Sequence, residues 1–108
     1  VEEEEVYIIV EQMPGFPGGE EALLKYISDH IEYPTMAVER GIEGRVTVRF
    51  VVNKDGYVQD VTVIRGVHEL LDKEAVRVIQ SLPRWNPGKQ NGVAVAVYYN
   101  VPVNFTLQ

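Results

Sequence analysis

Alternation of apolar and polar residues is the clearest pattern in the chain, and it is strongest in the last seventeen residues. From residue 93 onward every second residue is apolar: Val93, Val95, Val97, Tyr99, Val101, Val103, Phe105 and Leu107. A period of two predicts a β-strand with one face against a core. At about 3.4 Å per residue such a strand would extend roughly 50 Å, against a usual length of roughly 17 to 20 Å. We therefore expect part of its edge to stay unpaired.

The same stretch carries no charged residue between Gly92 and Gln108. Natural edge strands are usually protected by lysine, inward-facing charge or bulges, because unpaired N–H and C=O groups attract another strand. Pro102 cannot donate to a ladder, so one side of the strand is an edge or leaves the ladder there. Two interpretations stay open: a long central strand, or an edge left unprotected because a partner's strand docks on it.

The rest of the pattern predicts a chain in the order strand, helix, strand, strand, helix, strand, over residues 6–10, 20–31, 45–53, 57–65, 71–82 and 93–107. Residues 53–56 have the composition of a hairpin turn. In the strand 57–65 the apolar residues change from even-numbered to odd-numbered positions, and a bulge near Gln59 and Asp60 would explain this change. One further helical turn is expected over 35–40. The predicted fold class is α+β: a mainly antiparallel three-stranded sheet with the last strand at an edge, two helices packed on one face, and a short N-terminal strand at an edge that the pattern does not identify.

Composition divides the chain into an acidic start and a nearly neutral body. The net charge is −6, but four of the sixteen acidic residues stand at positions 2–5, which leaves twelve acids against ten bases. We expect residues 1–12 to be a linker stub with a short N-terminal strand and residues 13–108 to be one folded domain. The body has no cluster of basic residues of the kind that binds nucleic acid. The sequence also contains no run of about twenty apolar residues, the length that could span a bilayer. The absence of cysteine excludes disulfides but does not identify the compartment.

No residue set predicts catalysis. His30 and His68 lack metal-ligand spacing, Ser28 and Ser81 lie within helices, and no glycine loop carries the lysine of a phosphate site. We therefore expect no enzyme activity, no metal and no cofactor. Trp85, between two prolines, is either a binding platform or, as we favour, a loop anchor packed on the sheet.

Several motifs, taken in order, resemble the carboxyl-terminal domain of the TonB family. They are Tyr33-Pro34, Ala37, Gly41 to Val46, the strand 48–52 closed by Asp55-Gly56, Val58, Asp60-Val61, Leu71-Asp72, Glu74-Ala75 and Trp85 to Lys89. The resemblance covers residues 33–107. Residues 13–20, Met-Pro-Gly-Phe-Pro-Gly-Gly-Glu, are similar to the variant found in TonB proteins of the Bacteroidetes type.

The resemblance implies a periplasmic domain of an inner-membrane-anchored energy transducer. Its partners would be TonB-dependent outer-membrane receptors, through the segment called the TonB box, and the ExbB/ExbD complex, through a region upstream of this sequence. The box would add as a strand to the last long strand. The partner-binding residues implied are Asn91, Gly92, Val93, Ala94, Val95, Ala96, Val97, Tyr98 and Tyr99, together with His30 and Glu32 from the polar stretch before Tyr33, which lacks the glutamine and proline of the family pattern.

Two alternatives remain open at this stage. The same module can belong to a membrane sensor or peptidase, or it can be a structural domain that pairs edge to edge as a homodimer.

A further question concerns residues 6–10: if they take the edge of the last strand, the isolated domain is capped by its own chain, and a partner has to displace them.

Overall fold

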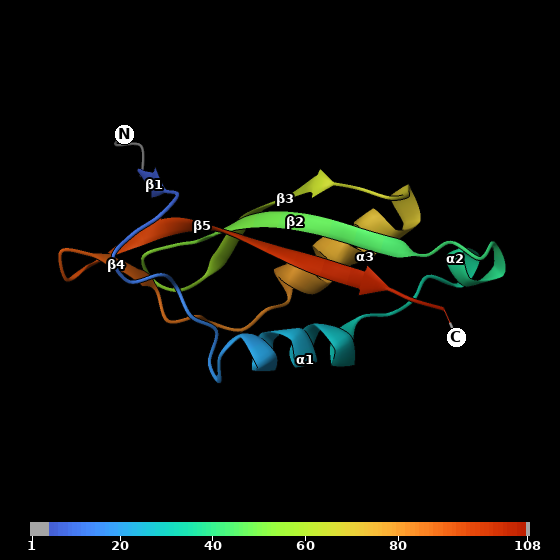
Figure 1. Cartoon of the computed structure of the whole chain (residues 1–108), viewed down its shortest axis with the longest axis horizontal. Coiled ribbons are helices and arrows are strands. Elements are labelled where there is room, and N and C mark those ends of the chain that lie inside the picture. The colour runs from blue at the N-terminus through green and yellow to red at the C-terminus, as the bar shows by residue number, and fades with distance from the viewer. Residues whose placement is uncertain (1–4, 108) are drawn as a thin grey trace.

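The computed structural model describes residues 5–107 and follows the predicted order of elements, with one added strand (Figure 1). The N-terminal strand is shorter than predicted and ends at Tyr7 instead of Val10. Its elements are β1 (Val6–Tyr7), α1 (Glu20–His30), α2 (Thr35–Glu39), β2 (Gly44–Val52), β3 (Val58–Arg65), α3 (Glu69–Gln80), β4 (Gly88–Gln90) and β5 (Val93–Phe105). The short helix α2 is the helical turn expected after Thr35. Strand β4 was not predicted. It lies in the segment before the last strand, part of which was expected to be a loop.

The sheet has the strand order β1-β5-β2-β3, with β4 paired to β5 outside this path. Strands β2 and β5 pair antiparallel over the whole of β2, from Gly44 opposite Phe105 to Val52 opposite Val97. Strands β2 and β3 are also antiparallel, whereas β1 runs parallel to β5. The α+β class is confirmed, and the predicted antiparallel three-stranded core is β5-β2-β3. The sheet as a whole is mixed, because of β1.

The bulge expected in the second hairpin strand is present. The register of β2 against β3 shifts between Arg49 and Val51, and Asp60 on the opposite strand has a φ of 52°. A bulge leaves one residue of a strand unpaired and reverses which face the following residues use. This explains why the apolar parity of β3 changes although its pairing with β2 continues.

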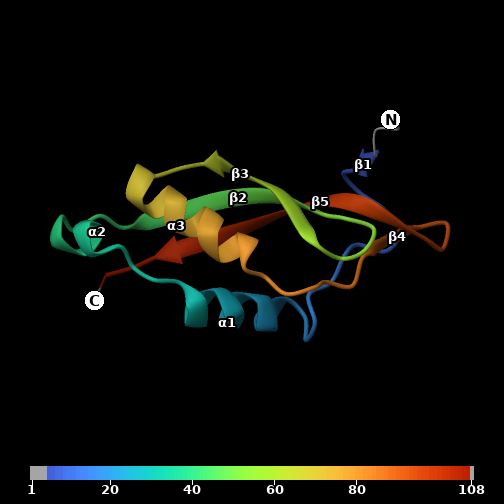
Figure 2. The same ribbon diagram turned by 180° about the vertical axis from the view of Figure 1, so that it is seen from behind.

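The core lies between the sheet and the helices, with α3 across one face of the sheet and α1 beside α3 on the side of β5 (Figures 1 and 2). Trp85 is 2% exposed and meets the rings of Phe16, Phe50 and Tyr99 at centroid distances of 5.5, 5.5 and 4.9 Å. Edge-to-face aromatic contacts of this kind add to the stabilisation from burial. Trp85 is therefore a loop anchor, as expected, and Phe16 is the buried plug of its loop.

Gly56 ties the hairpin turn of β2 and β3 to the Trp85 loop. It adopts a φ of 90°, and its carbonyl oxygen accepts a hydrogen bond of 2.7 Å from the Trp85 N–H. A Cβ at this position would stand 2.1 Å from the Trp85 carbonyl oxygen. The turn and the loop can approach this closely only because residue 56 is glycine.

We expect Gly56→Ala to lower the free energy of unfolding by about 3 kcal/mol or more, since left-handed backbone strain and a main-chain clash add. Gly41→Ala is the matched control, because Gly41 also has a positive φ of 66° but no atom within 4 Å of its Cβ position. The control should cost only about 1 to 2 kcal/mol. Urea titration followed by tryptophan fluorescence measures both, and equal losses would refute the steric contribution.

Candidate functional site

The two edges of β5 have different neighbours. One edge pairs with β2 over Val97–Phe105 and with β4 over Val93–Val95. The views of Figures 1 and 2 agree that β4 and the β2–β3 turn lie on one side of β5 and that β1 lies on the other. On this second side, which we call the outer edge, β1 pairs with Ala96 and Val97. Within residues 5–107, β1 is the only strand paired to the outer edge.

The hairpin between β4 and β5 determines which main-chain groups face the outer edge. Its two-residue turn has φ values of 53° at Asn91 and 76° at Gly92, as a type I′ turn requires. The pair that flanks such a turn, Gln90 and Val93, is a hydrogen-bonded pair, and main-chain groups alternate sides along a strand. The odd-numbered residues of β5 therefore point their N–H and C=O groups toward β4 and β2. The even-numbered residues point theirs toward the outer edge.

Pro102 agrees with this assignment. It lies opposite Thr47 within the ladder of β2 and β5, where a missing N–H would normally break a hydrogen bond. As an even-numbered residue, Pro102 faces the outer edge, so the ladder with β2 loses no donor. The outer edge therefore offers an uninterrupted set of donors at Ala94, Ala96, Tyr98 and Asn100 and ends at Pro102.

Two hollows lie beside the outer edge. The first, which we call the Tyr98 hollow, has a volume of about 400 Å³ and is lined by Ile8, Met13, Arg49, Tyr98, Tyr99 and Asn100. The second, the Pro102 hollow, has a volume of about 250 Å³ and is lined by Leu24, Ile27, Ser28, Ile31, Pro102 and Asn104. Both combine apolar side chains with a few hydrogen-bonding groups, the composition that accepts side chains of a bound peptide.

Tyr98, Arg49 and Asn100 give the first hollow its polar character. The Arg49 guanidinium lies 5.2 Å from the centre of the Tyr98 ring, in cation–π contact. Burial raises the pKa of the Tyr99 phenol, and the negative charge of Glu20 raises it further. The Tyr99 ring lies on the core face of the strand, against Phe50 and Trp85, and not in the hollow with the Tyr98 ring.

The structure places the predicted strand residues in three groups. Asn91 and Gly92 form the tip of the β4–β5 hairpin, and residues 93–95 pair with β4, where Val93 is 63% exposed. Ala96 and Val97 are buried beneath β1 and the sheet. The remaining two, Tyr98 and Tyr99, are half-buried and line a hollow.

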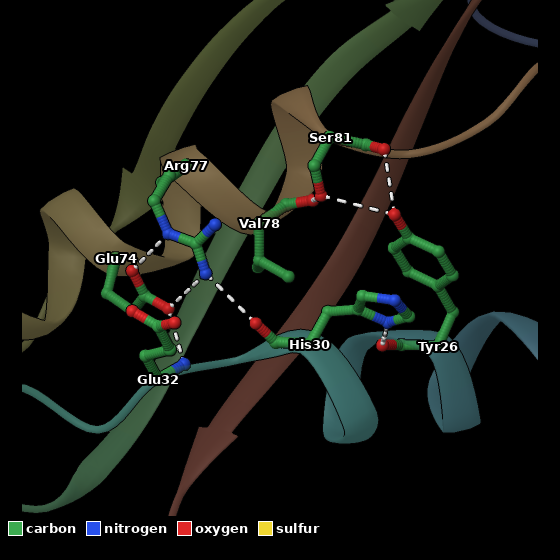
Figure 3. Close-up of polar contacts among 7 residues, drawn as sticks. All are labelled: Tyr26, His30, Glu32, Glu74, Arg77, Val78 and Ser81. Carbon is green, nitrogen blue, oxygen red and sulfur yellow. Dashed lines mark hydrogen bonds and ion pairs between the residues drawn. The ribbon is translucent and has the colours of Figure 1, made fainter.

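His30 and Glu32 lie at the end of α1 and contact α3 rather than β5 (Figure 3). The His30 ring stacks on the Tyr26 ring, with 3.9 Å between the ring centroids. The main-chain carbonyl oxygen of His30 accepts a 2.9 Å hydrogen bond from Arg77 Nη2. The Glu32 main-chain N–H donates to Glu74 Oε2. Neither side chain lines either hollow beside β5, so the structure does not bring these two residues together with the strand.

Glu74 is the buried centre of this polar cluster. Its carboxylate is 9% exposed and accepts two hydrogen bonds from Arg77, of 2.6 and 2.7 Å, besides that of Glu32. Burial alone would raise the pKa of Glu74, but the hydrogen bonds from Arg77 and the Glu32 amide, with the charge of Arg77, hold the pKa below its ordinary value. The ionised form therefore joins the end of α1 to α3.

Reasoning from the sequence missed strand β4 and the non-β5 residues that line the hollows. The signal for β4 was available, because Asn-Gly is the strongest two-residue indicator of a hairpin and stands at residues 91–92. No comparable local signal exists for Met13, Arg49 or Leu24, which reach the site through tertiary packing. None of the helices in residues 5–107 is both long and apolar enough to cross a membrane.

The chain is similar to a described protein family and to several of its members. The model of the family described as Gram-negative bacterial TonB protein C-terminal matches residues 29–107. Protein TonB of Helicobacter pylori (strain ATCC 700392 / 26695) is 34% identical over 83 residues, covering 76% of this chain and 28% of that protein. Protein TonB of Pseudomonas aeruginosa is 39% identical over 64 residues, covering 59% and 19%. The chain thus spans less than a third of these relatives.

Two solved structures have a similar fold. An NMR structure of the H. pylori TonB carboxyl-terminal domain has a TM-score of 0.64 at 30% identity, covering 82% of this chain and 92% of that one. The solution structure of the P. aeruginosa TonB domain has a TM-score of 0.53 at 31% identity, covering 71% and 80%. The match of the family model to residues 29–107 spans α2, β2, β3, α3, β4 and β5.

We expect acid to remove the stabilisation from Glu74. Because its pKa is lower in the folded state, this contribution is complete above the unfolded value of roughly 4.3 and is lost as the pH falls through the folded-state pKa. Glu74→Gln should cost about 1 to 3 kcal/mol at pH 7 and less at low pH. Glu69→Gln, on the same helix with an exposed ion pair to Lys73, is the control and should differ little from the parent. Urea titrations between pH 3 and 7 measure this, and a pH-independent cost would refute it.

Proposed function

We propose, from the premise that the chain belongs to the family of Gram-negative bacterial TonB carboxyl-terminal domains, that it binds outer-membrane receptors on behalf of a TonB-type energy transducer. One observation supports this most: the outer edge of the uncharged strand β5 carries main-chain donors from Ala94 to Asn100 beside two hollows, and within residues 5–107 only the two-residue strand β1 pairs there. The bound segment is the TonB box of a receptor, added as a strand. The proposal places the domain in the periplasm, and the ExbB/ExbD complex acts through sequence upstream of this chain.

The free energy of binding that we expect fits a short docked segment whose side chains contribute to the affinity. A docked strand makes about five main-chain hydrogen bonds, each worth roughly 0.5 to 1.5 kcal/mol net, whereas micromolar binding needs about 8 kcal/mol. Burying one or two apolar side chains in the hollows adds about 1.5 to 3 kcal/mol each. The hydrogen bonds carry no sequence information, so one domain can accept segments from several receptors.

The roles of the predicted residues differ within this proposal. The even-numbered residues of β5 provide the ladder, Tyr98 provides part of the wall of a hollow, and Tyr99 packs on the core. Asn91 and Gly92 hold the hairpin that orients the strand. For His30 and Glu32 we propose an indirect part, because their contacts with α3 position α1, which lines the Pro102 hollow.

A second candidate is pairing between two copies of the chain through the same edge, as in a self-pairing structural domain or the interaction module of a membrane sensor. It is favoured by the lack of charge along β5, which leaves nothing to repel an identical strand. Sedimentation equilibrium distinguishes the two: a homodimer predicts a concentration-dependent mass, and a receptor-binding domain predicts a monomer that binds box peptides.

We expect Asn100→Pro to weaken binding of a synthetic TonB-box peptide at least about fivefold, because it removes one outer-edge donor and places a ring in the path of the docked strand. The natural Pro102 shows that the ladder with β2 tolerates proline at an even position, so the variant should fold. Calorimetry gives the affinity, and proton–nitrogen NMR shows whether amides 94–100 shift.

Asn100→Ala is the matched control, since it removes the same side chain and keeps the N–H. Its affinity should stay within about twofold of the parent. If both variants bind the peptide as the parent does, the outer edge is not the docking surface.

A further inference from the structure

We infer that β1, together with Ile8 in the bend that follows it, is an internal segment that occupies the docking edge and must leave before a partner binds along the full length of that edge. This inference rests on the proposed function and concerns the regulation of the same site. The occupant is a segment of this chain, residues 6–8, and the partner competes with it.

The first argument is position. Val6 and Tyr7 pair with Ala96 and Val97, which lie in the middle of the run of donors from Ala94 to Asn100. A visiting strand that used this run would need the same main-chain groups. The two strands exclude each other, because one edge of a strand accepts one neighbour.

The second argument is weak attachment. The pairing of β1 with β5 covers two residues, whereas that of β2 covers nine. The next two side chains, Ile8 and Ile9, are 80% and 77% exposed, so burial hardly retains them. Segments with few buried apolar contacts and few hydrogen bonds open most readily.

The third argument is a firm anchor directly behind the weak strand. Val10 is buried, and Gln12 and Lys89 exchange two main-chain hydrogen bonds of 3.1 and 2.8 Å. Gly15 and Asn86 exchange two more of 2.9 Å. Residues 6–8 can therefore detach while residues 10–15 stay in place, and the tether returns them to the edge at a high effective concentration.

The fourth argument is the Tyr98 hollow itself. Ile8 contributes to its lining with Tyr98, Arg49 and Asn100. Because Ile8 follows β1 directly, release of the strand also removes Ile8 from this hollow. A partner then gains the hydrogen-bonding groups of the edge and the hollow in a single step.

The test uses the full chain and a Tyr7→Pro variant, which disrupts the pairing of β1 at the edge of the sheet. Tyr7→Val is the control, because it keeps the N–H and a strand-forming side chain. The probe is a synthetic peptide with the sequence of residues 3–11, EEEVYIIVE, followed by proton–nitrogen NMR. We expect at least tenfold tighter binding to Tyr7→Pro than to Tyr7→Val, with shifts at amides 94–100. Without peptide, the amides of Ala96 and Tyr98 should exchange with solvent at least tenfold faster in Tyr7→Pro.

Equal exchange rates or equal affinities in the two variants would overturn the inference. A TonB-box peptide, tested in parallel, separates it from the proposed function. If the chain's own peptide binds the released edge and box peptides bind neither variant, the proposed function fails and the internal segment stands. If box peptides bind both variants equally, the internal segment fails and the proposed function stands.

Discussion

The antiparallel ladder between β2 and β5 is the constraint on which the other features depend. It fixes nine residues of β5 against a central strand and directs all their odd-numbered main-chain groups to one side. Because β2 ends at Val52, the first four residues of β5 extend beyond it, and the short strand β4 pairs with most of this extension. The same ladder leaves the outer edge of β5 for another strand, either β1 of the chain itself or a strand of a partner.

The polar contacts between the helices complement this ladder from the other face. Glu74 and Arg77 on α3 hold the main chain at the end of α1, and Tyr26 donates a hydrogen bond to the Ser81 carbonyl oxygen (Figure 3). These contacts hold α1 against α3, beside β5, where it lines the Pro102 hollow. The main chain of β5 thus forms the outer edge, and α1, held in place by α3, forms one wall of the Pro102 hollow beside it.

The parts of the structure that could be predicted from the sequence are those determined by local patterns. Period-two alternation predicted β2 and β5, the parity change in β3 predicted the bulge at Asp60, and helical periodicity predicted α1 and α3. The family resemblance, and not a local pattern, assigned partner binding to the run from Val93 to Tyr99, which stays a prediction. The position of β1 could not be predicted, because two residues of parallel pairing have no local signature and depend on how residues 10–15 cross the molecule.

The site was predicted less completely than the fold for a similar reason. His30 and Glu32 are polar residues near Tyr33 in the sequence, but their orientation is set by Arg77 and Glu74, about forty residues away in sequence. Arg49 lies within the predicted strand 45–53 and was not predicted as a site residue, since its contact with Tyr98 requires the register of β2 against β5. Long-range pairing determined both outcomes, and single-sequence patterns do not contain it.

Pro102 has a consequence for the behaviour of the protein in concentrated solution. An exposed, uncharged strand is normally a template for fibrils, in which identical strands stack without limit and every main-chain group is satisfied by the next copy. Pro102 has no N–H to offer on the open side, so the pairing of an identical strand along this edge is interrupted at Pro102. Pro102 therefore limits how far along β5 a second copy can pair, a part that lysines usually take on an exposed edge strand.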